Sequence, residues 1–523
     1  MVNIELAREQ VFLDQCVGNE NIQVMLEGDL IVPDTKPDMA ILLQTDEKVI
    51  IDRTEAGADR INYLGRLNIS VLYVAKSADK SVHSINLSRP LDDFINLDGV
   101  NKDMWVRAKA EISNIDFRLV NDRKVNYRAI VTISVVAERS DAHEMVVHIN
   151  DVPENQLLKT NLNINRTIDN KIDRFTVKDQ VPLPSNKPNM REILQVTSTI
   201  ANQDVRISSG RVSISGQVLV TTLYRGDGED SLIEFIETEI AFNEPIDVSG
   251  SKDDMFADVF LQVVDYHVVS RPDDDGEDRI LDLEFAVGVE MKVYSTDTFS
   301  ILEDAYIINQ HLHLSKNSVR YPRVVCVNRN QAPIKEVVKI GNSMPDIFQV
   351  FRVKGHAHMD DVKVIDDKVV VEGAINTDIL YLAENDSSPL ASYRTVIPYK
   401  QTIEAKGARA SMRVSVDISI DHAAFNLLSP NETEVRFQLT FNTQVIEEES
   451  TSIISNIEFT DIDPDFLSNQ ASMTVYIVQG SDSLWKIAKR YNTPIDELMA
   501  INDIDVPNRL SAGQKLLILK KGV

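Results

Sequence analysis

The chain has 523 residues, enough for about three to five domains of ordinary size. It carries 81 acidic and 54 basic residues, a formal net charge of −27, and a surface of that sign repels phosphate backbones, which excludes nucleic acid as a partner class. Mean hydropathy is −0.16, and no apolar run approaches the roughly 18 residues of a membrane helix. We therefore expect no transmembrane segment.

The first residues and the cysteine content both favour the cytoplasm. Charged residues, among them Glu5, Arg8 and Glu9, interrupt the segment where a secretory signal needs an apolar core. The two cysteines, Cys16 and Cys326, are too few for a disulfide framework in so long a chain. A reducing, cytoplasmic compartment is the expectation.

A repeated pattern then divides the chain. Three short segments share a Pro followed by Asp or Asn and an apolar stretch: residues 36–44, 187–195 and 344–350. Each precedes a longer alternating segment with a central Gly and a final Tyr: residues 60–73, 211–224 and 368–381. The spacing is 28 residues from Pro to Gly and 8 from Gly to Tyr in every copy. The copies start 151 and then 157 residues apart, the size of a whole domain, which predicts three tandem homologous domains.

Each of these units is predicted to be β-rich. The alternation of polar and apolar residues is that of a strand with one buried face. Further alternating stretches follow at 124–138, 279–294 and 434–448, and short polar connections such as 121–123 and 273–278 are typical of hairpins. A Gly inside a strand predicts a bulge or a close backbone approach, and the Pro segment predicts a turn and one short helix. The predicted fold class is mainly β, with a β-sandwich or a partly open barrel in each unit.

The composition predicts where the units end. We expect β units at 1–150, 151–315 and 316–446 and a small α+β module at 474–520. Residues 447–473 contain seven acidic residues and no basic one, which predicts a solvated acidic linker.

The last module has the pattern of two strands around two helices. A strand is predicted at 475–478 and another at 516–519. Apolar residues from Leu484 recur at helical spacing, with Asp482 or Ser483 as the N-cap, and a second helix is predicted to begin with Thr493 as its cap and Pro in its first turn. The order is βααβ.

This module resembles a LysM domain in its segments 476–478, 482–488 and 513–518. The family usually places Gly directly before the Asp of its first loop, whereas this chain has Ser481 there. The resemblance implies a shallow groove that binds N-acetylglucosamine chains of peptidoglycan. The residues at the matching positions are Gly480, Ser481, Asp482, Ser483, Leu484, Ile504, Val506, Asn508 and Leu510.

Three β-rich repeats followed by this module resemble the SPOCS-plus-LysM family of spore-coat morphogenetic proteins. The resemblance implies a non-enzymatic scaffold in the mother-cell cytoplasm at the forespore surface, with the coat ATPase SpoIVA as partner of the LysM domain and other spore coat proteins as further partners. A LysM domain in the cytoplasm needs a ligand other than the cell wall, and Ile477 and Trp485 are candidate anchors for a protein. Trp485 also suits a core position. Peptidoglycan binding through the groove is the alternative.

Other candidate sites have simpler interpretations. His356 with His358, and His311 with His313, are spaced to share a strand face, but no metal-binding spacing accompanies them. The acidic segment 273–278 lacks the register of a calcium loop and is predicted to be a hairpin turn. No motif of nucleophilic catalysis or phosphate binding is present, so no catalytic residue, cofactor or metal is predicted.

Overall fold

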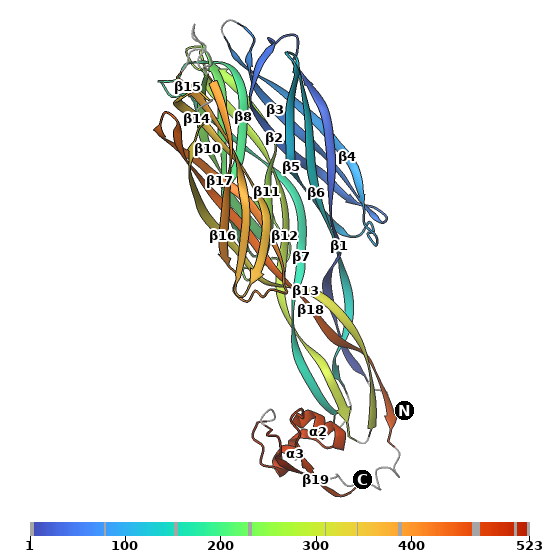
Figure 1. The fold of residues 1–523 in the computed structure, drawn as a ribbon. Helices are drawn as coiled ribbons and strands as arrows, with labels where there is room; N and C mark the ends of the chain where they lie inside the picture. Colours follow the sequence, from blue (N-terminus) through green and yellow to red (C-terminus); the bar gives the residue numbers. More distant parts are fainter. Residues whose placement is uncertain are drawn as a thin grey trace.

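A computed structural model describes residues 5–77, 80–150, 155–227, 233–308, 310–341, 344–384, 390–462, 471–506 and 510–519. Within these residues it holds twenty strands and two short helices. Eighteen strands form three consecutive six-stranded units, and the other two strands and the helices belong to a small C-terminal module (Figure 1). The mainly β fold class and the three repeated units are confirmed.

The units have the same order of elements. Unit 1 contains β1 (Leu6–Ile31), β2 (Met39–Ala56), β3 (Arg60–Ala75), β4 (Val82–Asn96), β5 (Trp105–Asn121) and β6 (Lys124–Ile149). Unit 2 contains β7 (Asn155–Pro182), β8 (Met190–Ser208), β9 (Arg211–Gly226), β10 (Ile233–Asp247), β11 (Phe256–Pro272) and β12 (Asp278–Ile307). Unit 3 contains β13 (Gln310–Lys339), β14 (Ile347–Ile365), β15 (Lys368–Ala383), β16 (Leu390–Glu404), β17 (Arg413–Ser429) and β18 (Glu432–Asp461).

Each unit is a sandwich of two three-stranded antiparallel layers, and the second layers of units 2 and 3 join at the pair Ile307–Gln310 into one six-stranded sheet. In unit 1 the sheet β2-β3-β4 packs on the sheet β1-β6-β5, and the equivalent strands pair in the same order in units 2 and 3. The core lies between the sheets because alternate residues of the predicted strands face inward; β3, for example, buries Ile61, Tyr63, Leu67 and Ile69. The sandwich alternative of the sequence prediction is therefore the observed one.

The repeated Gly occupies the same kind of site in all three units. A Cβ atom on Gly65 would collide with the carbonyl oxygen of Ile50, and one on Gly373 would collide with that of His358. The neighbouring strand carries a register shift opposite the Gly in each unit. The predicted bulge with close backbone approach is confirmed.

The repeated Pro marks a turn that leads directly into a strand, so the predicted short helix is wrong. The residues after it pair with the third strand of their unit from Met39, Met190 and Ile347 onward, and this pairing takes the backbone groups that a helix would use. The repeated Tyr fastens the turn, because its hydroxyl donates to the carbonyl oxygen of the repeated Pro. The three bonds are Tyr73 to Pro37 at 2.9 Å, Tyr224 to Pro188 at 3.1 Å and Tyr381 to Pro345 at 3.1 Å.

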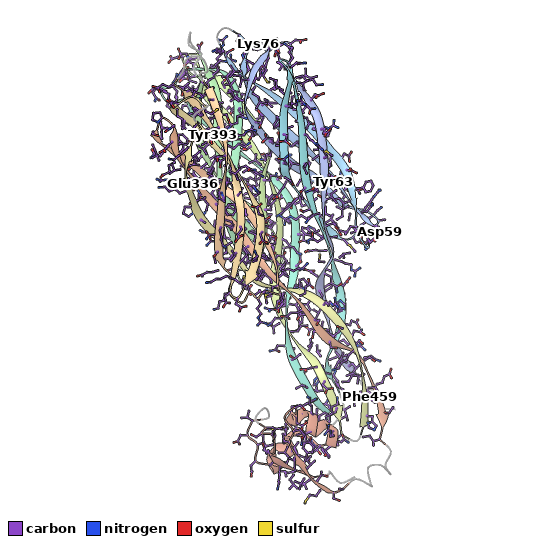
Figure 2. The ribbon with its side chains drawn as sticks, viewed as in Figure 1. Asp59, Tyr63, Lys76, Glu336, Tyr393 and Phe459 are labelled. Atoms are coloured by element: carbon purple, nitrogen blue, oxygen red, sulfur yellow. The ribbon has the colours of Figure 1, made fainter. Side chains whose placement is uncertain are left out.

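Six strand halves leave the sandwiches together and form a stalk (Figure 1). The stalk consists of the paired segments 6–16 with 138–149, 155–167 with 294–307, and 310–324 with 446–461. Equivalent residues of the three units meet along its centre, for example Val11, Leu162 and Val319. Phe459 lies toward the far end of the stalk (Figure 2).

The sandwiches also meet around a common line, which makes the body of the protein an approximate threefold arrangement. Leu43, Leu194 and Phe351 occupy equivalent positions of β2, β8 and β14 and share one buried cluster. Because three equivalent residues touch one another both here and in the stalk, the three units pack as the subunits of a trimer do.

Two expected boundaries differ from the structure. The limit between the second and third units falls between Ile307 and Gln310, so the expected limit at 315 lies inside β13. The expected acidic linker at 447–473 is strand β18 as far as Asp461. Its acidic residues are used in the stalk, since Glu447 and Glu449 both pair with Arg323. Residues 463–470 lie outside the described residues.

Candidate functional site

The C-terminal module consists of β19 (Met473–Ile477), α2 (Leu484–Tyr491), α3 (Ile495–Ile501) and β20 (Lys515–Leu519). The two strands pair antiparallel, and the helices pack on one face of the pair. This is the predicted βααβ order. The residues predicted to form the apolar face of the first helix, Leu484, Ile487 and Ala488, are buried in its core.

The loop before α2 is fixed by its own side chains. The carboxylate of Asp482 accepts hydrogen bonds from the Tyr476 hydroxyl at 2.6 Å and from the backbone N–H of Gln479 at 2.9 Å. The bond from Tyr476 is the main reason why the pKa of Asp482 lies below its usual value. Ser483 is the N-cap, and its hydroxyl accepts from the N–H of Lys486. Asp482 and Ser483 therefore shape the loop.

The other expected groove residues divide into exposed and packed positions. Gly480 and Ser481 are exposed, and a side chain added at Gly480 would meet open space. Ile504 and Leu510 are half-buried and pack against the core of the module, whereas Val506 is 43% exposed. Leu484 is buried, and Asn508 lies outside the described residues.

The second helix begins differently from the prediction. Thr493 is buried, and its hydroxyl donates back to the carbonyl oxygen of Tyr491 instead of capping the helix. Pro494 takes the cap position and makes no side-chain hydrogen bond there. Asn502, at the other end of α3, joins the helix to β20 because its side chain bonds both backbone groups of Leu517.

Trp485 contacts the stalk. Its indole N–H donates to the carboxylate of Asp304 at 2.8 Å, and its ring packs edge-on against Tyr306 with 5.0 Å between centroids. Lys489 pairs with the same carboxylate at 2.6 Å. The hydroxyl of Tyr306 donates to the carbonyl oxygen of Thr493 at 2.8 Å. The face of α2 that carries Trp485 is thus docked on the end of β12.

Asp304 is the central acceptor of this docking interface. Burial alone would raise the pKa of its carboxyl group, but the hydrogen bonds from Lys489 and Trp485 outweigh burial and lower the pKa below the usual value. The carboxylate is therefore held in its charged form. Sequence reasoning missed this residue because it lies 181 positions before Trp485 and belongs to no motif.

The outer face of the module's sheet is apolar and uncovered. Met473, Val475 and Ile477 alternate along β19 and are 60%, 61% and 50% exposed. We call these three residues the outer row. Leu517, which pairs with Val475 on β20, is half-buried. Three large apolar side chains in a row on an exposed strand are a typical protein contact surface.

The histidine pairs and the cysteines belong to the β units, with Cys16 on β1 and Cys326 on β13. His356 and His358 are on β14 in the body, and His311 and His313 are on β13 in the stalk. Among the residues that the structure describes, no group of three or more His, Cys, Asp or Glu side chains is placed to hold a metal ion. The acidic segment 273–278 is the turn of the β11–β12 hairpin.

Comparison with family models identifies both parts of the chain. The SipL SPOCS-domain model matches residues 23–120, 189–269 and 346–428, about half of the chain, with one match in each unit. The chain belongs to the SipL family of SPOCS-domain proteins. The LysM model matches residues 476–519, so the C-terminal module of this SipL-family protein is a LysM domain. Comparisons with curated proteins and with solved structures gave no match.

These assignments confirm the resemblance seen in the sequence and set the class of function. SPOCS and LysM domains are non-catalytic binding domains, and their combination fits a role at the spore coat or in peptidoglycan binding. The LysM domain indicates a glycan or a protein as ligand. Within the described residues, no helix is long and apolar enough to cross a membrane.

Proposed function

We propose that this SipL-family protein is a non-enzymatic scaffold of spore coat assembly, which acts in the mother-cell cytoplasm at the forespore surface. Its LysM domain binds a coat ATPase of the SpoIVA type, and the body contacts other coat proteins. The observation that carries the proposal is the outer row, an uncovered apolar strip on the LysM domain. Family membership supports the setting.

The docked LysM domain leaves one face available to a partner. The α2 face is held by Asp304 and Tyr306, so Trp485 is engaged within the chain. The outer row belongs to the sheet, and the contacts with Asp304 and Tyr306 come from α2 and Thr493. Of the two anchors expected from the sequence, Ile477 is the one that a partner can reach without undocking the domain. Apolar anchors of this kind supply most of the binding energy of a protein interface.

Peptidoglycan binding is the second candidate, and one observation favours it. Gly480 and Ser481 are exposed on the loop before α2, where the LysM family binds sugar, and no atom of the described residues lies within 4 Å of a Cβ placed at Gly480. A glycan would use this loop, whereas a protein would use the outer row.

Binding by the purified full chain separates the two functions. The chain and its variants would be tested against purified SpoIVA and, in parallel, against insoluble peptidoglycan. Val475→Asp and Ile477→Asp place a charge in the outer row, and Ala500→Asp adds the same charge at an exposed position of α3. Gly480→Trp places a large side chain on the exposed loop, where a Cβ meets no described atom within 4 Å.

We expect the wild type, Ala500→Asp and Gly480→Trp to retain SpoIVA. Binding should fall at least about tenfold in Val475→Asp and Ile477→Asp, because each of these two substitutions buries a charge at the contact. Retention on peptidoglycan that Gly480→Trp abolishes, without retention of SpoIVA, would establish the glycan function and refute the scaffold contact. Circular dichroism of each variant checks that the domain remains folded.

A further inference from the structure

Three equivalent polar residues meet where the three units join. Gln44 of β2, Gln195 of β8 and Arg352 of β14 occupy the same position of the repeat and are 0%, 4% and 7% exposed. One terminal nitrogen of Arg352, Nη2, donates to the side-chain oxygens of both glutamines, at 2.9 Å for Gln195. A buried guanidinium on the common line is thus held by two neutral amides.

Four nitrogen atoms of this group have no hydrogen-bond partner among the described residues. They are Nε and Nη1 of Arg352 and the amide nitrogens of Gln44 and Gln195. The glutamine oxygens face the guanidinium, so the amide N–H groups point elsewhere. All four are donors, and buried donors without acceptors are rare in folded proteins. The guanidinium of Arg352 therefore keeps two donors without an acceptor among the described residues.

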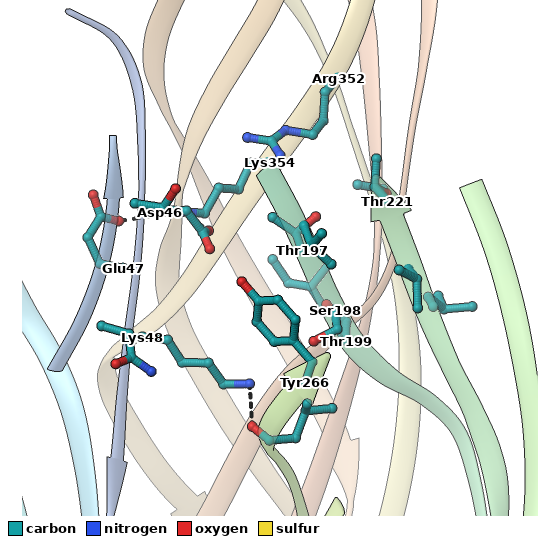
Figure 3. A pocket seen from close by; sticks show the side chains of 18 of the residues that line it. Asp46, Glu47, Lys48, Thr197, Ser198, Thr199, Thr221, Tyr266, Arg352 and Lys354 are labelled. Atoms are coloured by element: carbon teal, nitrogen blue, oxygen red, sulfur yellow. Dashed lines mark hydrogen bonds and ion pairs between the residues drawn. The ribbon is translucent and has the colours of Figure 1, made fainter. Parts of the chain in front are cut away.

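A cavity of about 680 Å³ adjoins this group and is lined by Arg352. The same three strands contribute to its walls, with Asp46 from β2, Thr197 from β8 and Lys354 from β14 at equivalent positions (Figure 3), and β11 and β17 contribute as well. Tyr266 also lines the cavity. A volume of this size admits a small organic molecule.

The carboxylates nearest Arg352 are paired with other cations and do not accept from its guanidinium. Lys354 is paired with Asp46 at 2.6 Å and lies 3.4 Å from Glu47, so these two carboxylates are already engaged. Asp378 is paired with Arg394 at 2.8 Å. The glutamine oxygens that hold Arg352 are neutral. Burial lowers the pKa of Arg352 although Asp46 and Asp378 act in the opposite direction.

A second cation lines the same cavity. Lys48 donates to the backbone carbonyl oxygen of Val263 at 2.7 Å, and burial lowers the pKa of Lys48 to about 8. Four further acidic residues line the cavity. Glu237, Glu239 and Asp265 are exposed, whereas Asp421 is buried and accepts hydrogen bonds from Gln331 and Thr440.

We propose that the junction of the three SPOCS units is a binding site for a small oxyanion, a phosphate or carboxylate group, which Nε and Nη1 of Arg352 hold. The site is separate from the LysM domain and from the function proposed for it. A buried guanidinium with two unpaired N–H donors is the group that binds such oxygen atoms.

Calorimetric titration of the full chain tests this site. One arm uses inorganic phosphate and the other uses acetate, each at an ionic strength kept constant with sodium chloride. Arg352→Gln gives unit 3 the residue that the other two units have, so its fold is expected to persist. Gln195→Glu places an internal carboxylate beside the guanidinium. Arg413→Gln, which removes an exposed arginine of β17, is the control.

We expect saturable binding of one anion per chain, at least tenfold weaker in Arg352→Gln and in Gln195→Glu and unchanged in Arg413→Gln. Binding of phosphate alone identifies a phosphate-bearing ligand, and binding of acetate identifies a carboxylate. Absence of saturable binding in both arms, or equal affinity of the wild type and both junction variants, would overturn the proposal. Because Gln195→Glu retains Arg352, its result stands even if Arg352→Gln does not fold.

Discussion

Replacing Asp304 by Ala is expected to loosen the LysM domain from the stalk. The change removes the acceptor of the Trp485 indole, a hydrogen bond to a charged group that contributes about 1.5 to 3 kcal/mol. It also removes the ion pair with Lys489, whose side chain is 38% exposed, so that pair contributes less than about 1 kcal/mol. The sum of about 1.5 to 4 kcal/mol corresponds to a shift of roughly 10- to 700-fold toward the undocked state.

Tryptophan fluorescence measures this shift directly. The chain has two tryptophans, so in a Trp105→Phe background the emission reports Trp485 alone. Asp304→Ala should move the emission to longer wavelength and increase quenching by acrylamide, because the indole becomes hydrated. Glu303→Ala, which removes an exposed carboxylate from the neighbouring position of β12, is the matched control. Equal emission and quenching in the two variants would refute the role of Asp304.

Acid should have the same effect as the substitution. The pKa of Asp304 is lower in the docked protein than its usual value near 3.9. A carboxyl group whose pKa is lowered stabilises the docked state fully above that usual value, and the stabilisation is lost as pH falls through the lower, docked pKa. Trp485 emission should therefore be constant above about pH 5 and shift below about pH 4. Asp304→Ala should lack this transition.

Further predictions concern the repeated residues of the SPOCS units and are checked by urea unfolding of the full chain. Gly65→Ala should lower the free energy of unfolding by about 1 to 3 kcal/mol, because the added methyl group meets the backbone oxygen of Ile50. In the control Gly480→Ala, whose added Cβ meets no described atom within 4 Å, the free energy of unfolding should change by less than about 0.5 kcal/mol. A neutral Gly65→Ala would contradict the close approach. Tyr224→Phe leaves the carbonyl oxygen of Pro188 without its donor and should cost about 1 to 2 kcal/mol; an unchanged midpoint would show that the hydroxyl does not fasten the turn.

The sequence predicted the structural features that depend on residues close together in the chain. The alternating segments became strands, the Gly inside them marked a bulge, and Ser483 was one of the two expected caps of α2. These features follow from local periodicity and backbone sterics. The spacing of 36 residues between the repeated Pro and Tyr was visible as well, and the structure explains it as one hydrogen bond.

The assembly of the units was not predictable from the same patterns. Val11 and Leu162 look like ordinary inward-facing strand residues, and nothing in their alternation distinguishes a contact within a unit from one between units. The acidic composition of 447–461 suggested solvent, because Arg323, which neutralises two of these residues, lies more than 120 positions earlier. The expected groove and anchors of the LysM domain remain predictions, apart from Trp485, whose indole is bonded to the stalk.

Because the three repeats lie on one polypeptide, their equivalent residues can differ, whereas those of a trimer of identical subunits cannot. In such a trimer any residue on the rotation axis occurs three times, and three buried guanidinium groups in contact would repel one another. Here the three copies have diverged, so one cation, Arg352, stands between two amides. Fusion of the three copies thus permits one arginine and two glutamines to meet at the common line. Self-association of a single repeat would place three identical residues there.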